Sequence, residues 1–121
     1  MISGFATAEG TKNFKQNSSV NPMNFNIFET LHLSNVGMGT YLGDSDAKTD
    51  ELVKNAVKQS VMSGINVIDT AINYRGQKAE RSVGRAMLEL VEEKGCKPCN
   101  IKLKSRKDLK DTDMVLTLDC R

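Results

Sequence analysis

The sequence lacks tryptophan, and aromatic residues make up only 5% of it. None of them follows Tyr74, so the rest of the chain offers no aromatic platform on which single-stranded nucleic acids could stack. It also lacks an apolar run of about 18 residues, which excludes a readable membrane-spanning helix. The opening residues have neither the basic start nor the apolar stretch of a secretory signal. We therefore expect a soluble, cytoplasmic protein without a membrane partner.

Cysteine is scarce and its number is odd, at three in 121 residues, which argues against the disulfide framework of a small secreted protein. Cys96 and Cys99 have the spacing seen in zinc and redox motifs. Only Cys120 and the distant His32 are available to complete the four ligands that a structural zinc site requires. We therefore expect free thiols and no metal.

Positive charge is concentrated late in the chain, although the formal net charge is only +2. Residues 1–93 carry nine Lys or Arg against eleven Asp or Glu, whereas residues 94–110 carry seven basic residues against Asp108 alone. Such a cluster can attract phosphates. Because no aromatic residue accompanies it, a solvated basic tail is the favoured interpretation, and no nucleic-acid partner is expected.

The first part of the chain shows no sustained hydrophobic period. Residues 1–26 are polar and rich in turn formers, which indicates an extended N-terminal arm. The interrupted alternation of residues 27–33 predicts a short strand, or one arm of a hairpin with residues 35–42.

From Thr49 the pattern becomes helical. Thr49 is the predicted N-cap and Gly64 the predicted C-terminal glycine. A short strand that is apolar on both faces follows at Ile65 to Ile68, as in covered parallel sheets. A second helix, ending at Gly95, is predicted from residues at helical spacing: Val83, Ala86, Met87, Leu90 and Val91. With a further strand at 100–105, the order βαβαβ predicts a parallel α/β sheet.

Two parallel architectures compete for this pattern. A doubly wound dinucleotide-binding sheet needs a G-x-G-x-x-G turn that opens directly into a helix. Here Gly37 and Gly39 are followed by Gly43, one place late, and Asp69 lies too far on for the ribose-binding position. A (β/α)8 TIM barrel fits better, because it places catalytic side chains at the carboxyl ends of successive strands.

Asp69 ends the buried strand, and Tyr74 follows five positions later. A strand-end Asp is often only a turn former, and a loop Tyr is often a packing residue. A phenol with a pKa near 10, however, is protonated at neutral pH and can give its proton to a developing alkoxide. The two residues are therefore a candidate acid/base pair for carbonyl reduction.

Three segments together carry a resemblance. Residues 37–43 (GMGTYLG), 66–75 (NVIDTAINYR) and 80–86 (ERSVGRA) resemble the N-terminal third of an aldo-keto reductase. Residues 5–11 resemble the start of a bacterial-type or plant branch of that superfamily, and the likeness runs over most of residues 5–94.

The resemblance implies a (β/α)8 barrel in which NADPH passes a hydride to an aldehyde or ketone without a metal. It assigns Asp69 and Tyr74 to the first two members of a catalytic tetrad of Asp, Tyr, Lys and His. It places the cofactor's nicotinamide end against the loop after the first barrel strand and beside the catalytic carboxylate, which makes the expected cofactor residues Gly39, Thr40, Tyr41 and Asp69.

The departures from the family pattern concern the other half of the tetrad. Lys104, or less favourably Lys102, falls where the family lysine is expected, but the hydroxyl residue that usually precedes it is missing. A solvated tail is favoured over a catalytic lysine there. No histidine follows Tyr74, and His32 lies upstream of the first motif, where a surface or hairpin position is expected.

We therefore expect an α/β chain that forms the first two to three β/α units of a partial TIM barrel. Its expected parts are an N-terminal arm (1–26), the N-terminal part of an NADP-dependent oxidoreductase domain (27–105) and a divergent basic tail (106–121). Because a complete barrel takes at least about 200 residues, a truncated product without activity of its own is expected. The alternative is a non-catalytic pseudoenzyme or interaction fragment that associates through exposed strand edges.

Overall fold

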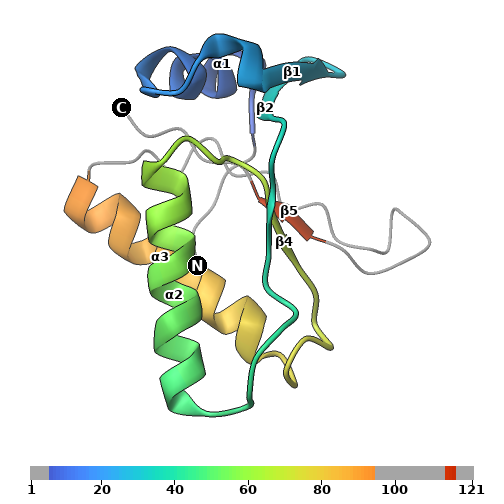
Figure 1. The fold of residues 1–121 in the computed structure, drawn as a ribbon, viewed down its shortest axis with the longest axis vertical. Coiled ribbons are helices and arrows are strands. Elements are labelled where there is room, and N and C mark those ends of the chain that lie inside the picture. The colour runs from blue at the N-terminus through green and yellow to red at the C-terminus, as the bar shows by residue number, and fades with distance from the viewer. Residues whose placement is uncertain (1–5, 95–113, 117–121) are drawn as a thin grey trace.

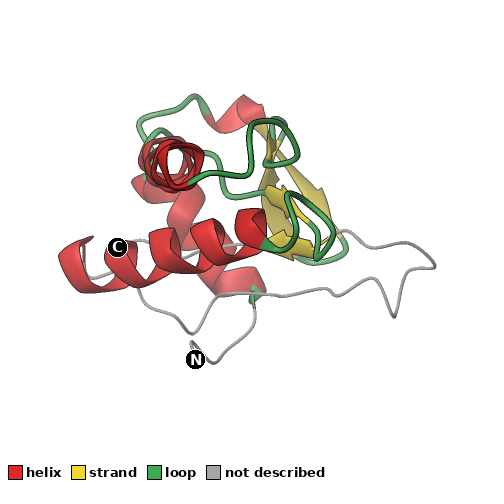
Figure 2. Ribbon diagram, turned by 90° about the horizontal axis from the view of Figure 1, so that it is seen from below, coloured by secondary structure: helices red, strands yellow, loops and turns green. Residues whose placement is uncertain are grey.

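The computed structural model describes residues 6–94 and 114–116. Helices α2 (Ala47–Met62) and α3 (Lys78–Lys94) cover one face of a sheet formed by β3 (Met38–Gly39), β4 (Ile68–Thr70) and β5 (Met114–Leu116). At one end lie α1 (Ala8–Asn17), a 3₁₀ turn (Pro22–Asn24) and the hairpin of β1 (Phe25–Phe28) and β2 (Leu31–Ser34) (Figure 1). Seen from below, helices and sheet form two layers (Figure 2).

The N-terminal segment contains a helix, so the predicted extended arm was wrong. The Thr7 hydroxyl caps α1 by accepting a hydrogen bond from the Gly10 N–H at 2.9 Å. The apolar stripe of α1 is narrow: Phe14 is buried and meets Phe25 edge to face, with ring centroids 6.3 Å apart. One aromatic in a polar helix leaves no period for sequence analysis to detect.

The hairpin exists, but with a different partner from the one expected. β1 and β2 pair antiparallel across a turn at Glu29, whose φ is +56°, with Phe28 opposite Leu31. Within residues 35–42, Met38 and Gly39 instead pair parallel with β4. His32 lies in β2, and so is a hairpin residue as expected.

Buried Asn66 joins the hairpin to the segment that leads into β4. Its side-chain amide donates to the His32 carbonyl at 2.9 Å and accepts from the Ser34 N–H at 2.8 Å. The side chain is only 1% exposed, so these bonds satisfy polar atoms that water does not reach.

Helix α2 begins earlier than predicted. Asp46, not Thr49, is the N-cap: its carboxylate accepts the Thr49 N–H at 2.7 Å. The predicted end is confirmed, because Gly64 directly follows the C-cap residue with a φ of +96°.

The strand–helix–strand unit β3–α2–β4 is parallel, as predicted, with Met38 opposite Ile68 and Gly39 opposite Asp69. The third strand differs from the prediction. The expected strand at 100–105 lies outside the described residues, and β5 falls in the predicted tail and pairs antiparallel with β4. The structure thus has the α/β content of a partial barrel domain, and the sheet of the described residues is three strands wide.

The core lies between the two long helices and the sheet. Ile68 on β4 is 1% exposed and packs with apolar side chains of both long helices. The α3 positions are those that helical spacing predicts, whereas Leu52 and Ala56, which the same spacing places on the apolar face of α2, are exposed. The helix residues of this cluster are Val57 and Val61 from α2 and Val83, Ala86, Met87 and Leu90 from α3. Among the described residues, no helix has both the length and the apolar character required to cross a membrane.

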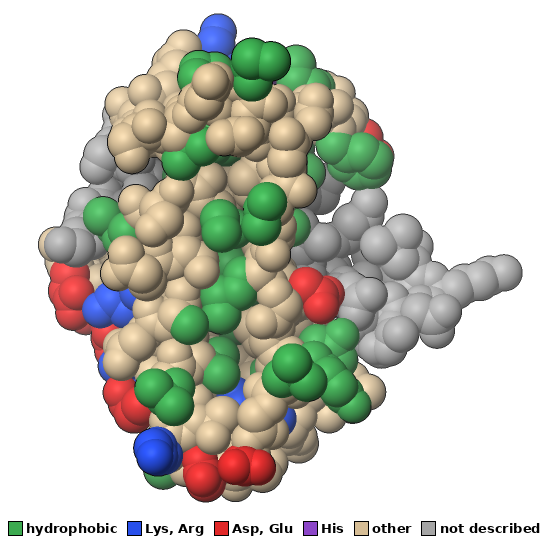
Figure 3. All heavy atoms as spheres, in the orientation of Figure 1, with side chains coloured by type: hydrophobic (Ala, Val, Ile, Leu, Met, Phe, Trp, Pro, Cys, Tyr) green, Lys and Arg blue, Asp and Glu red, His purple; other side chains and the backbone are tan. Residues whose placement is uncertain are grey.

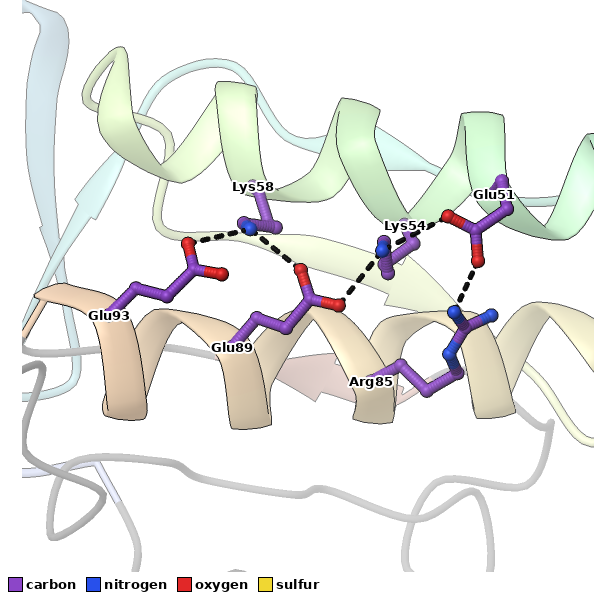
Figure 4. Close-up of polar contacts among 6 residues, drawn as sticks. All are labelled: Glu51, Lys54, Lys58, Arg85, Glu89 and Glu93. Atoms are coloured by element: carbon purple, nitrogen blue, oxygen red, sulfur yellow. Dashed lines mark hydrogen bonds and ion pairs between the residues drawn. The ribbon is translucent and has the colours of Figure 1, made fainter.

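A ladder of ion pairs joins the outer sides of α2 and α3 (Figure 4). Glu89 lies at its centre: one carboxylate oxygen is 2.8 Å from Lys54 Nζ, and the other is 2.6 Å from Lys58 Nζ. The ladder also includes Glu51, Arg85 and Glu93. Hydrogen bonds from Lys54 and then Lys58 lower the pKa of the Glu89 carboxyl from 4.5 to about 2.

We predict that this ladder makes the stability of the domain depend on acid pH. The folded-state pKa of Glu89 is depressed, so its stabilising contribution is present above the ordinary value of 4.5 and is lost as the pH falls towards about 2. Urea unfolding of wild type across this interval should show a falling midpoint, and Glu89→Gln should show a shallower fall.

The matched control is Glu92→Gln, which removes the same charge from an exposed position one turn further along α3. It should keep the acid dependence of the wild type. Equal slopes for Glu89→Gln and wild type would contradict the prediction.

Candidate active site

Parallel pairing brings the carboxyl ends of β3 and β4 to the same edge of the sheet. There, Thr40 makes two hydrogen bonds to the Asp69 carbonyl, one from its N–H at 3.1 Å and one from its hydroxyl at 2.9 Å. Thr40 is 2% exposed, so both bonds lie away from solvent. They hold the backbone of Asp69 in place. Asp69 is the middle residue of β4, so the strand lies later than the predicted Ile65–Ile68 and ends at Thr70.

Tyr74 returns to this edge through a tight turn. Its N–H donates to the Ala71 carbonyl at 3.0 Å, and its own carbonyl accepts from the Ala79 N–H at 3.4 Å, at the start of α3. The phenol hydroxyl lies 3.4 Å from Asp69 Oδ2, within reach of a long hydrogen bond. The carboxylate and the phenol proposed from sequence therefore lie on the same side of the sheet.

A second tyrosine flanks the pair. The rings of Tyr41 and Tyr74 meet edge to face, with centroids 5.1 Å apart and an interplanar angle of 73°. Tyr41 is 64% exposed, and Leu42, next to it, and Ile72, two residues before Tyr74, are also exposed. In the space-filling view, charges of both signs lie along the left and lower margins, and apolar side chains occupy the middle and lower right of the face (Figure 3).

The residues expected to meet the cofactor differ in how accessible they are. Gly39 is exposed, and a Cβ added there would meet none of the described atoms within 4 Å, so space is open beside it. The Thr40 hydroxyl is instead engaged with the Asp69 carbonyl. Thr40 thus supports the strand end, while Gly39 and Tyr41 border open space.

Lys104 and Lys102, the candidate lysines, lie outside the described residues. His32 lies in the hairpin sheet rather than on β3 or β4. Burial, followed by the charges of Lys15 and Lys12, lowers the pKa of His32. The described part of the chain contains no group of three His, Cys, Asp or Glu side chains placed to hold a metal ion.

Sequence analysis assigned no role to an ion pair beside the site. Arg75, directly after Tyr74, places Nη1 2.7 Å from Asp50 Oδ1, and its side chain is only 3% exposed. Asp50 lies in the first turn of α2. Spacing rules do not pair a helix residue with a loop residue so distant in sequence.

The family model for the aldo/keto reductase family matches residues 35–112. The chain belongs to the aldo/keto reductase family. The matched region takes in β3, α2, β4 and α3, and therefore Asp69 and Tyr74. No curated protein and no solved structure matches the chain. Family membership supports a general oxidoreductase function, and aldo/keto reductases generally use NADP(H) and act on small carbonyl compounds.

Two neighbouring threonines give a paired test of how the site is supported. Thr40→Val keeps the shape of the side chain but removes the hydroxyl that holds Asp69, so it should lower the free energy of unfolding by about 1 kcal/mol. The Thr70 hydroxyl is buried without a hydrogen-bond partner among the described residues. Thr70→Val should therefore be neutral or stabilising.

Urea unfolding of both variants measures the difference. Equal losses in the two variants would show that the Thr40 hydroxyl does not support the strand end.

Proposed function

We propose that Asp69 and Tyr74 are the acid/base pair of a site that reduces an aldehyde or ketone to an alcohol with NADPH. The observation that carries this proposal is the 3.4 Å approach of the Tyr74 hydroxyl to Asp69 Oδ2 at the carboxyl edge of two parallel strands. This edge is where barrel enzymes place their chemistry. Membership of the aldo/keto reductase family supplies the reaction class.

In this mechanism the Tyr74 hydroxyl donates its proton to the carbonyl oxygen as negative charge develops there. The proton returns to Tyr74 from solvent, and the reverse transfer serves alcohol oxidation. The Asp69 carboxylate accepts from the phenol in the resting site and so orients it. When bound, the reduced nicotinamide supplies the hydride that the carbonyl carbon accepts.

The described residues fit the nicotinamide end of such a cofactor. The open space beside Gly39 and the exposed ring of Tyr41 border the Asp69–Tyr74 pair, and together they suit a flat, mostly apolar ring. Thr40 contributes indirectly, by holding Asp69. Lys104, or less favourably Lys102, is the proposed ammonium that would lower the pKa of the phenol in catalysis.

We propose that the isolated chain has negligible activity, because its sequence supplies a firm match to only two members of the family tetrad, Asp69 and Tyr74. For the domain organisation we propose a reductase part at residues 27–105, preceded by residues 1–26 and followed by a basic tail at residues 106–121.

The test separates competence of the pair from activity of the chain. Residues 35–94 would replace the corresponding segment of a complete aldo/keto reductase, and NADPH consumption with a generic aldehyde would be measured. The chimera should turn over, and Tyr74→Phe should lower its kcat by about 10²- to 10⁴-fold. A folded chimera without activity, or one insensitive to Tyr74→Phe, would contradict the proposal. Turnover by the isolated chain would contradict the claim that it has negligible activity.

A non-catalytic interaction role is the second candidate, and the edge of β3, which no strand of the described residues covers, favours it. β3 is an edge strand of the described sheet, and the Met38 and Thr40 N–H groups bond inwards to the β4 segment. The intervening Gly39 N–H therefore faces the open edge, where it can pair with another strand.

On this second candidate, sedimentation velocity should show concentration-dependent self-association of the full chain. Gly39→Pro should abolish it, because proline removes the donor from the edge. A monomer at all concentrations would remove the support for self-association.

A further inference from the structure

We propose that the Asp50–Arg75 ion pair is a positioning device: it fastens the loop that carries Tyr74 to the first turn of α2 and keeps the phenol within reach of Asp69. The role of this ion pair in catalysis rests on the function proposed above. Its effect on the position of the phenol does not, and that effect can be tested without measuring turnover.

The Arg75 side chain is buried although it belongs to a surface turn. Only 3% of it is exposed, and Nη1 lies 2.7 Å from Asp50 Oδ1 and 3.3 Å from the Asp44 carbonyl oxygen. The other Asp50 oxygen lies 3.8 Å from Lys78 Nζ. One carboxylate at the start of α2 thus links the residue after Tyr74 with the first residue of α3.

The backbone around Arg75 is held by the same neighbourhood. Its carbonyl accepts from the Ser45 hydroxyl and from the Lys78 N–H, each at 3.3 Å. Its φ of +50° is the left-handed region, which a residue with a Cβ rarely adopts unless its surroundings impose it. The turn is therefore not a conformation that the peptide would keep by itself.

The opposing loop also packs tightly against the first turn of α2. Gly43 has a φ of +112°, and a Cβ there would come within 2.6 Å of Thr49 Cγ2 and 4.0 Å of Arg75 Cδ. The loops before α2 and before α3 therefore meet at the Arg75 side chain, and Asp50 is the carboxylate that contacts its guanidinium there.

This arrangement is sensitive to loss of the carboxylate. Arg75 Nε and Nη2 are buried and have no hydrogen-bond partner among the described residues. The guanidinium is contacted by the Asp50 carboxylate at Nη1, while Asp46 acts on it only through its charge, without a hydrogen bond. Without Asp50 the buried cation would lose the carboxylate that contacts it, so the side chain should turn out to water and take the backbone of the turn with it.

The phenol is the group that such a movement would disturb first. Tyr74 is the immediate neighbour of Arg75, and its 3.4 Å contact with Asp69 is already at the long end of hydrogen-bond distances. A small displacement of the turn that lengthens it is therefore enough to break this contact. Asp69 itself is held separately, by Thr40.

The chain lends itself to a spectroscopic test, because Tyr41 and Tyr74 are its only tyrosines. With ¹³Cζ-labelled tyrosine, NMR of the full chain gives two signals, assigned with Tyr41→Phe. Asp50→Asn should shift and broaden the Tyr74 signal, and should raise amide exchange at residues 72–77 by at least about tenfold relative to the β4 amides, since loop opening is a local event.

Glu51→Gln is the matched control. It removes the same charge from the adjacent residue of the same helix, but Glu51 pairs with Lys54 and Arg85 rather than with Arg75. Its Tyr74 signal and loop exchange should match those of the wild type.

Arg75→Met serves as the second variant, since it removes the buried cation together with its need for a partner. It should reproduce the Tyr74 change. An unaltered Tyr74 signal in both folded variants would overturn the proposal. So would global unfolding of both under conditions in which Glu51→Gln stays folded, because the pair would then hold the whole domain. Neither outcome depends on whether the chimera reduces carbonyls.

Discussion

The candidate site depends on the parallel register of two very short strands. Because Gly39 lies opposite Asp69, the next residue, Thr40, falls where its N–H and its hydroxyl both reach the Asp69 carbonyl. A slip of one residue would turn the Asp69 side chain to the other face of the sheet. Gly37 helps to set this register, since a Cβ there would lie 3.2 Å from Val67 Cγ1.

Strands of two and three residues do not stabilise themselves, so their stability comes from the helices and the hairpin. Ile68 packs against apolar side chains of α2 and α3, while Asn66 fastens the start of the same segment to β2. The ion-pair ladder on the outer side of the two helices favours their mutual alignment. The layer that covers the sheet thereby fixes the edge at which Asp69 stands.

The sequence was informative wherever a period or a strand end carried the signal. The 3.6-residue spacing located α3 and most of α2, and the position of Asp69 after an apolar strand located the site edge. It was less informative where pairing was non-local. The alternation of residues 27–33 indicated a strand but not its partner, because the hairpin of residues 25–34 turns at Glu29, without glycine. Helix α1 has one deeply buried aromatic, a pattern that does not differ from that of a loop.

The contrast between local signals and non-local contacts also separates Asp69 from Tyr74. Asp69 lies in β4, next to the buried Ile68, so its placement follows from hydrophobic pattern and strand register. Tyr74 stands in a turn with positive φ at Arg75, and its placement follows from a contact with Asp50 on another element. A motif therefore records that both residues are present, whereas the distance between their oxygens is set by packing that no motif contains. The alignment of the phenol is thus governed by the Arg75 turn more than by the sheet.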